Sequence, residues 1–217
     1  MILVASTALR VAPADFRAGV RARFGGELRR AGSFAQLCLL GAQACLDAAG
    51  GEGSLGLLWS SRLGALHAVR AALDEGLRRG EPAMPFAFIA MQPHLAGALL
   101  AQRGYAVTRA AHLHLAQGSW PLTLRTAQSW LADCERVLLG WAEESDSDDI
   151  AHRSDWCLLR KEGAPGTARC TPEQGPEAAT SATAEDWIAR VTAWRALARG
   201  PLVLRGDEEA WRFALEE

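Results

Sequence analysis

The chain alternates short apolar runs with longer segments that carry apolar residues at helical spacing. Continuous apolar runs, which are typical of strands covered on both faces, lie at residues 2–5, 55–59 and 136–142. Helical patterns lie at residues 14–30, 33–48, 63–79, 93–104 and 122–131. Strands that alternate with helices predict an α/β fold with a mostly parallel sheet and helices on both faces.

The second half of the chain gives weaker patterns. Segments rich in Pro, Gly and Ala predict loops, and they lie at residues 81–92 and 163–182. The other predicted elements are a strand at 156–160, a capped helix at 183–197, and a strand followed by a helix from residue 201 onward. The residue pair Ser33 and Gln36 predicts a capping box at the start of the helix at 33–48.

A turn of mostly small residues, Ala116–Trp120, joins the apolar segment at 105–115 to the helix predicted from residue 122. We call this turn the elbow. In many α/β enzymes such a junction holds a nucleophile, because the helix N-terminus carries partial positive charge and free N–H groups. The elbow contains no cysteine, and Ser119 is its only hydroxyl. The elbow therefore has the structural setting of a nucleophile but lacks the cysteine that would act as one.

Composition and charge narrow the classes of function. A chain of 217 residues with 49% hydrophobic and 22% charged residues is globular rather than disordered. A net charge of −2 favours neither nucleic acid nor an anionic membrane as partner. Five cysteines without a C-x-x-C pair indicate buried thiols in a reducing compartment rather than a zinc or redox site.

The sequence predicts a cytoplasmic protein that binds no metal or cofactor. The N-terminal segment lacks the basic region of a signal peptide. No run in the chain approaches the roughly 18 apolar residues of a membrane span. The acidic run at 143–149 is interpreted as a solvated loop rather than as a metal site.

Four segments carry a family resemblance through their order along the chain: Ser33–Leu37, Leu55–Leu66, Met91–Gly97 and Leu138–Glu144. Together they resemble the N-terminal half of β-ketoacyl synthases. The resemblance implies a thiolase-like half with a mixed, mostly parallel five-stranded sheet in residues 1–150. Residues 151–217 are expected to form a divergent C-terminal extension that packs on the same domain. The second half of a full synthase, with its two histidines, is expected to be absent.

Alignment on Gly140–Glu143 places Gln117 where these enzymes carry their nucleophilic cysteine. An amide nitrogen cannot attack a thioester. A glutamine here resembles the chain-length factors of type II polyketide systems, which pair with an active ketosynthase. The resemblance implies a non-catalytic subunit that forms a heterodimer with a full-length β-ketoacyl synthase and shapes its acyl tunnel. Polyketide, aryl polyene or fatty acid-type biosynthesis is the implied pathway class.

The resemblance also implies where partners bind. In thiolase-fold dimers the nucleophile strands of the two subunits pair, and an apolar edge strand would otherwise invite aggregation. The expected interface residues are Val107, Arg109, Ala111, Leu113, Leu115 and Trp120. Acyl carrier protein is expected to be an indirect partner, with Arg62 and Arg109 as candidates for contact with its acidic surface.

Two other functions stay open from the sequence. A small acyltransferase or hydrolase would use Ser119 with His112 or His114, which share a strand face because side chains repeat every two residues. Two histidines are too few for a zinc site, a half-buried or interface strand is the more common setting for such a pair, and no G-x-S-x-G motif is present. A homodimeric scaffolding protein without pathway chemistry is the other alternative.

Overall fold

The computed structural model describes residues 1–28, 30–78, 80, 84–163, 167–173, 179–197, 200–207 and 209–215. Its elements are, in chain order, β1 (Ile2–Val11), α1 (Pro13–Phe24), α2 (Ser33–Ala49), β2 (Leu55–Ser60), α3 (Leu66–Arg78), α4 (Pro85–Ala90), α5 (Leu95–Gln102), β3 (Val107–Leu113), α6 (Pro121–Trp130), β4 (Arg136–Glu143), β5 (His152–Arg160), β6 (Ala168–Glu173), β7 (Thr180–Ser181), α7 (Trp187–Leu197), β8 (Leu202–Arg205) and β9 (Ala210–Leu215).

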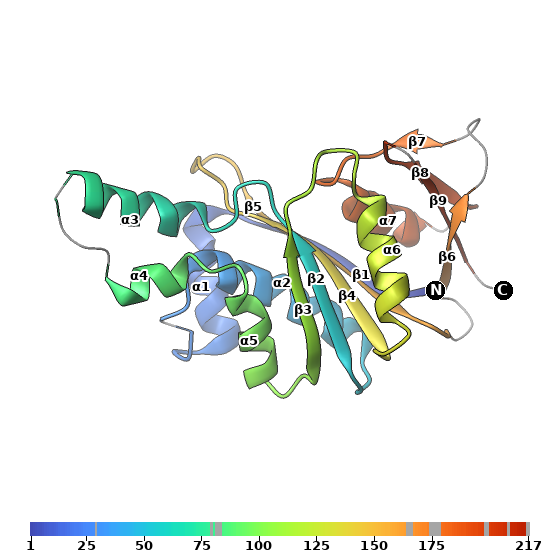
Figure 1. The fold of residues 1–217 in the computed structure, drawn as a ribbon, viewed down its shortest axis with the longest axis horizontal. Helices are drawn as coiled ribbons and strands as arrows, with labels where there is room; N and C mark the ends of the chain where they lie inside the picture. Colours follow the sequence, from blue (N-terminus) through green and yellow to red (C-terminus); the bar gives the residue numbers. More distant parts are fainter. Residues whose placement is uncertain are drawn as a thin grey trace.

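One sheet of nine strands runs through the described residues in the order β3-β2-β4-β5-β1-β6-β9-β8-β7 (Figure 1). β2 is parallel to both of its neighbours, β3 and β4, whereas β5 is antiparallel to β4 and β1. The predicted mixed sheet is confirmed, with nine strands in the described residues instead of the five expected. Its parallel part is smaller than predicted. The reason is the short loop at 144–151 between β4 and β5, because a direct return of this kind allows only an antiparallel neighbour.

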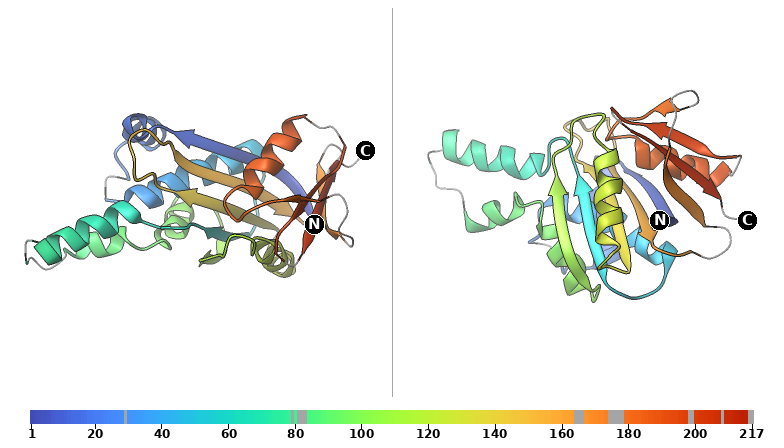
Figure 2. Two further views of the ribbon diagram at one scale, coloured as in Figure 1. Left: turned by 90° about the horizontal axis from the view of Figure 1, so that it is seen from above. Right: turned by 45° about the vertical axis from the view of Figure 1, so that its right-hand side comes forward.

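Helices cover both faces of the sheet, as predicted. α1, α2 and α5 lie on one face, and α6 and α7 lie on the other (Figure 2). Neighbouring residues of β2 illustrate the division, because Leu57 belongs to the core under α2 and Leu58 to the core under α6. The sequence of β2 is apolar at nearly every position because both of its faces are covered.

Close contact between α2 and β5 fixes the centre of the first core. The indole of Trp156 is fully buried and donates a hydrogen bond from Nε1 to Ser154 Oγ at 2.7 Å. Ser154 in turn donates to the carbonyl of Leu37 in α2 at 2.9 Å. A Cβ on Gly41 would overlap Ser154 Oγ and lie 2.6 Å from Trp156 Nε1. Only glycine therefore lets α2 approach the sheet this closely.

Three expectations about the weaker segments are wrong. The predicted loop at 81–92 contains the short helix α4, and the predicted loop at 163–182 contains β6 and β7. The segment from residue 201 forms two strands, β8 and β9, instead of a strand and a helix. Pairing explains the strands, since β6 is held by β9 across a long stretch of sequence, which local composition does not reveal. Residues 81–83, 164–166 and 174–178 of these segments lie outside the described residues.

The capping box predicted at the start of α2 is also wrong. Gly32 is the N-cap residue, and no side chain caps the helix. The hydroxyl of Ser33 instead donates to the carboxylate of Glu144, at the end of β4. The amide of Gln36 donates to the carbonyls of Leu28 and Ala31, both at 2.8 Å. Ser33 therefore bonds to a distant residue, and Gln36 bonds to the segment just before the helix, instead of to each other's backbone.

The division of the chain at residue 150 stays a prediction. β5, which follows this boundary, lies between β4 and β1 in the middle of the sheet. β6, α7, β8 and β9 contribute side chains to the core under α6. Of the helices that the structure describes, none has both the length and the apolar character needed to cross a bilayer.

We predict that Gly41→Ala lowers the free energy of unfolding by about 1–3 kcal/mol, because the added methyl group overpacks the contact between α2 and β5. Gly19→Ala in α1 is the matched control. A Cβ there meets no atom within 4 Å, so the higher helix propensity of alanine is expected to stabilise the protein by about 0.5–1 kcal/mol. Urea unfolding followed by circular dichroism measures both changes. Equal effects of the two substitutions would contradict the close packing.

Candidate functional site

The elbow lies between the end of β3 and the start of α6, as the sequence predicts. Because β2, β3 and β4 run parallel, the elbow lies at the edge of the sheet where their carboxyl ends meet. In open α/β sheets this edge is the usual place for a binding site. Gln117 is exposed here, and Ser119 is half-buried.

Gln117 takes part in the fold through its backbone. Its carbonyl accepts a hydrogen bond from the N–H of Ala184 at 2.5 Å. Ala184 precedes α7 in the C-terminal part of the chain. The side-chain amide can donate and accept hydrogen bonds, but it supplies no nucleophile.

None of the five cysteines belongs to the elbow, and four of them are unsuited to act as nucleophiles. All five are buried and none forms a disulfide. Burial raises the pKa of the Cys45 thiol to about 12 and raises the pKa values of Cys38, Cys157 and Cys170 well above the ordinary range. A thiol of this kind does not ionise near neutral pH, so it carries no thiolate.

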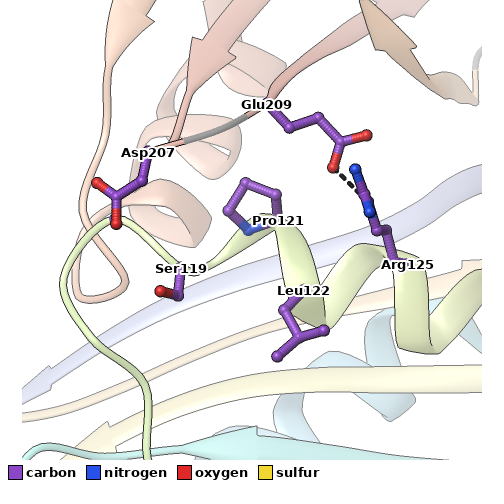
Figure 3. A pocket seen from close by; sticks show the side chains of 7 residues that line it. Ser119, Pro121, Leu122, Arg125, Asp207 and Glu209 are labelled. Atoms are coloured by element: carbon purple, nitrogen blue, oxygen red, sulfur yellow. Dashed lines mark hydrogen bonds and ion pairs between the residues drawn. The ribbon is translucent and has the colours of Figure 1, made fainter.

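An open pocket of about 230 Å³ lies beside the elbow, at the N-terminus of α6 (Figure 3). It is lined by Gly118, Ser119, Pro121, Leu122, Arg125, Asp207 and Glu209. Nε of Arg125 forms an ion pair with Glu209 at 2.6 Å. Two carboxyl side chains therefore occupy the place where a helix N-terminus would otherwise favour an anion. A histidine is not among the residues that line this pocket.

His112 is partnered elsewhere. Its Nε2 forms a hydrogen bond with the hydroxyl of Ser61 at 2.9 Å, beyond the end of β2. Its ring packs edge-on against Trp59 and Phe34, with centroid distances of 5.6 and 6.3 Å. Burial, with a smaller effect of His94, lowers the pKa of His112 to about 4. The imidazole is thus neutral at pH 7 and bound to a serine other than Ser119.

The structure therefore does not bring the residues of the serine alternative together. Ser119 lines the pocket at α6, His112 contacts Ser61, and His114 is exposed. In the part of the chain that the structure describes, no group of three or more His, Cys, Asp or Glu side chains is arranged to hold a metal ion.

Two C-terminal segments contact the elbow: the turn between β8 and β9, and the residues just before α7. The N–H of Asp207 donates to the carbonyl of Gly118 at 2.9 Å. A Cβ on Gly118 would overlap the carboxylate of Asp207, and a Cβ on Gly206 would overlap the carbonyl of Gly118. The turn between β8 and β9 therefore lies directly against the backbone of the elbow. We call this contact, together with the bond from Ala184 to Gln117, the elbow clamp.

Trp120 belongs to the same contact, which corrects the expectation that it lies at an interface. It is fully buried, and its indole Nε1 donates to the carbonyl of Ala182 at 3.1 Å. Its ring stacks on Trp187 of α7, with centroids 5.2 Å apart. The side chain is used within the chain and is not available to a partner. The sequence shows an aromatic residue at this position but not which element covers it.

The other expected interface residues lie along β3 and after it. β3 is an outer strand of the sheet. Val107, Ala111, Leu113 and Leu115 are half-buried, and Arg109 is exposed and forms an ion pair with Asp133 at 2.5 Å. Their role in an interface stays a prediction.

Two carboxylates at the end of β4 have structural roles that the sequence did not suggest. Glu143 accepts hydrogen bonds from the backbone N–H groups of Arg62 and Leu63, at 2.7 and 3.1 Å. Glu144 is buried and accepts from the backbone N–H of His67 at 3.1 Å. Burial raises the pKa of Glu143. The position of these residues directly after a buried strand was a usable signal, because such residues lie at the functional edge of a parallel sheet.

Comparison with known proteins gave matches by structure alone. No model of a protein family matches the chain, and no curated protein matches it in sequence. The chain is similar in structure to a ketosynthase in complex with its chain length factor from Xenorhabdus doucetiae, with a TM-score of 0.64, 15% identity and 99% coverage of both chains. It is similar to the ishigamide ketosynthase/chain length factor, with a TM-score of 0.58, 14% identity, and coverage of 79% of this chain and 67% of the other.

A third similar structure is a type II polyketide acyl-carrier protein in complex with its ketosynthase bound to the hexaketide. The TM-score is 0.60 at 10% identity, and 99% of both chains is covered. At this level of identity the similarity concerns the fold. The chain thus has the thiolase-like fold of ketosynthase and chain length factor complexes.

We predict that Gly118→Ala destabilises the protein by about 1–2 kcal/mol, because the new methyl group overlaps the carboxylate of Asp207. Asp207→Ala removes that carboxylate, so the double variant is expected to be about as stable as Asp207→Ala alone. Thermal unfolding of the four proteins completes a double-mutant cycle. Strictly additive effects would show that the two residues do not touch.

We predict that the stability of the protein falls as the pH is lowered from 6.5 towards 4. The folded state holds the pKa of His112 at about 4, below its ordinary value of 6.5, so the unfolded chain binds the proton more readily. The stabilisation is complete above the ordinary pKa and is lost as the pH falls. His112→Gln is expected to flatten the change in melting temperature between pH 7 and pH 4.5. Gln128→Ala, which changes a non-titrating residue at an exposed position, is the control and should keep the slope of the wild type.

Proposed function

We propose that the chain is a non-catalytic, chain-length-factor-like subunit that pairs with an active β-ketoacyl synthase and limits the length of the acyl chain. The observation that carries the proposal is the elbow. The resemblance puts Gln117 where a ketosynthase carries its nucleophilic cysteine, and the backbone N–H groups of Ala184 and Asp207, from the C-terminal part of the chain, hydrogen-bond to the backbone of the elbow. An architecture that holds a catalytic junction without its nucleophile suits a supporting subunit.

The chemistry around the elbow supports an absence of independent activity. Serine acts as a nucleophile when a base and an orienting group adjoin it. Ser119 adjoins the pocket of Asp207 and Glu209 instead, and the histidine of β3 is bound to Ser61. Acyl donors that carry phosphopantetheine are anionic, so the carboxylate of Asp207 disfavours their approach to this pocket, whereas Glu209 is neutralised by its ion pair with Arg125.

The outer edge of β3 supports pairing with a second chain. Thr108, Arg109 and Ala110 are exposed along this strand. Unpaired N–H and C=O groups on such an edge are a template for another strand. At the opposite end of the described sheet, β7 has two residues, so β3 offers the longer edge for pairing.

The partners follow from this arrangement. The partner at β3 would be a ketosynthase, which would supply the catalytic cysteine and histidines. Side chains near the meeting point, including Leu113 and Leu115, would narrow the acyl tunnel and set product length. Acyl carrier protein would dock mainly on the ketosynthase, with Arg62 as a secondary contact. The buried free thiols fit a reducing compartment such as the cytoplasm.

A homodimeric scaffolding protein is the second candidate, because the same edge of β3 can pair with a second copy of the chain. The serine-dependent acyltransferase or hydrolase loses support because His112 is hydrogen-bonded to Ser61 and does not line the pocket of Ser119. The oligomeric state of the purified chain, alone and after co-expression with a ketosynthase, distinguishes the two remaining functions.

We predict that a full-length β-ketoacyl synthase from the same organism co-purifies with the chain and that condensation requires both proteins. The chain alone should form no acyl-enzyme when it is incubated with acyl carrier protein thioesters, even as Gln117→Cys, because no histidine is among the described residues that line the pocket at the elbow. Intact-mass spectrometry and a condensation assay provide the measurements.

The variant Ala110→Asp tests the role of β3 in that complex. It places a carboxylate on the exposed edge strand and is expected to weaken the complex at least tenfold. Ala18→Asp, at an exposed position in α1, is the control. An acyl-enzyme on the isolated wild-type chain, or a complex that tolerates Ala110→Asp as well as the control, would argue against the proposed function.

A further inference from the structure

Exposed apolar side chains gather on one projection of the molecule. Eight of the twelve large hydrophobic residues that are exposed in the described chain lie between residues 63 and 89. They are Leu63, Val69, Leu73, Leu77, Met84, Phe86, Phe88 and Ile89. They belong to α3, α4 and the residues just before these helices, and we call residues 63–78 and 84–90 the arm. Figures 1 and 2 show the arm extending away from the body of the molecule.

The exposed apolar area of the arm is large enough for a binding surface. Leu77 is 81% exposed, and Phe88 is 61% exposed. Taking roughly 200 Å² for a fully exposed aromatic side chain and less for an aliphatic one, the eight side chains together present several hundred Å² to solvent. That sum is comparable to the largest apolar patch of an ordinary monomer, about 300–600 Å², and such patches are often functional.

The charges on the arm favour a protein over a membrane. The helix α3 carries Arg70 and Arg78, and it also carries Asp74 and Glu75. Arg78 forms an ion pair with Asp74 at 3.0 Å. A helix that binds an anionic bilayer concentrates basic residues on its polar face. Balanced charge beside an apolar stripe is typical of a helix that packs on another protein.

The base of the arm is held firmly. The N–H groups of Arg62, Leu63 and His67 bind the carboxylates of Glu143 and Glu144. Side-chain Nε2 of His67 also forms a hydrogen bond with the carbonyl of Ser145 at 2.7 Å. These bonds fix the start of α3 on the end of β4. A surface that is ordered before binding loses less entropy when a partner docks.

The second helix of the arm is fixed as well. A Cβ on Gly32, the N-cap of α2, would lie 2.6 Å from the carbonyl oxygen of Ala90. The end of α4 therefore packs directly on the start of α2. The guanidinium of Arg30 lies 5.6 Å from the ring centre of Phe86, within the range of a cation–π contact.

The arm starts beside the ends of β2 and β3, where buried ring contacts connect these elements. The chain returns from α4 through His94, whose ring packs edge-on against Trp59 at 6.1 Å. Trp59 also contacts His112 of β3 at 5.6 Å. The arm thus begins where β2 and β3 end, and it projects from that edge of the sheet (Figure 2). A chain paired with β3 would meet the apolar side chains of the arm.

We propose that the arm is a second docking surface for the ketosynthase that pairs with β3, so that one partner chain covers both. This inference rests on the proposed function. It adds that α3 and α4 supply the apolar part of the contact, whereas β3 supplies its backbone hydrogen bonds. Glu143 and Glu144 are then positioning residues for the interface, because they hold α3 on the sheet.

Site-specific crosslinking tests the proposal on the co-expressed complex. A photoreactive phenylalanine analogue at position 77 or 88 is expected to crosslink to the ketosynthase. The same analogue at Leu122 or Leu197, which are 51% and 69% exposed outside the arm, is expected to give no such product.

Substitution of the apolar side chains gives a second test. The double variant Leu77→Glu with Phe88→Glu should weaken the complex at least tenfold. Leu197→Glu, outside both the arm and the pocket at the elbow, should leave the affinity unchanged, and circular dichroism should show that every variant is folded.

The outcomes separate the two proposals. A complex that co-purifies but gives no crosslink from 77 or 88, and that tolerates the double variant, would overturn the role of the arm and leave the proposed function intact. Crosslinks between two copies of this chain would also overturn it, because the occupant would then be a second copy. A wild-type chain that binds no ketosynthase would refute the proposed function and with it this occupant of the arm.

Discussion

The contact between the elbow and the C-terminal part of the chain fixes the junction of β3 and α6 within the fold. Asp207, in the turn between β8 and β9, donates a backbone hydrogen bond to Gly118, and Ala184, just before α7, donates one to Gln117. These bonds orient the start of α6, so that Trp120 stacks on Trp187 in the core under α6. A junction that would be a reaction centre in an enzyme is thereby part of the packing on the α6 side.

The outer edge of β3 and the arm are not covered in this way. β3 leaves its outer edge uncovered, and the arm leaves several apolar side chains in solvent. Both features would be liabilities in an isolated protein. They are consistent with each other if a single partner chain covers them, and the anchoring of the arm on Glu143 and Glu144 gives that partner a preformed surface.

The sequence predicted those parts of the fold that depend on local patterns. Continuous apolar runs identified β2 and β4, and the strand–turn–helix junction at the elbow was located correctly. Parts that depend on distant partners were missed. β6 is held by pairing with β9, Ser33 bonds to Glu144 rather than to its own helix, and Trp120 is covered by α7. Each of these contacts joins residues that are far apart in the chain, so local propensity carries no record of them.

The candidate site shows the same limit. The sequence indicated that the elbow lacks a cysteine and that His112 and His114 share a strand. It could not show that His112 is bound to Ser61, or that the carboxylate of Asp207 lies directly against Gly118 of the elbow. The pKa of His112 depends chiefly on burial, which is a property of the folded chain and not of the residues beside it.

Amide hydrogen exchange, compared between the chain alone and the chain with its co-purified ketosynthase, tests the central claim most directly. The account predicts that binding slows exchange in β3 and in the arm, whereas exchange at the elbow and in the turn between β8 and β9 is unchanged. Protection at the elbow and at the pocket of Ser119, with β3 and the arm unaffected, would contradict it. Such a result would mean that the partner or substrate binds at the junction rather than at the open edge.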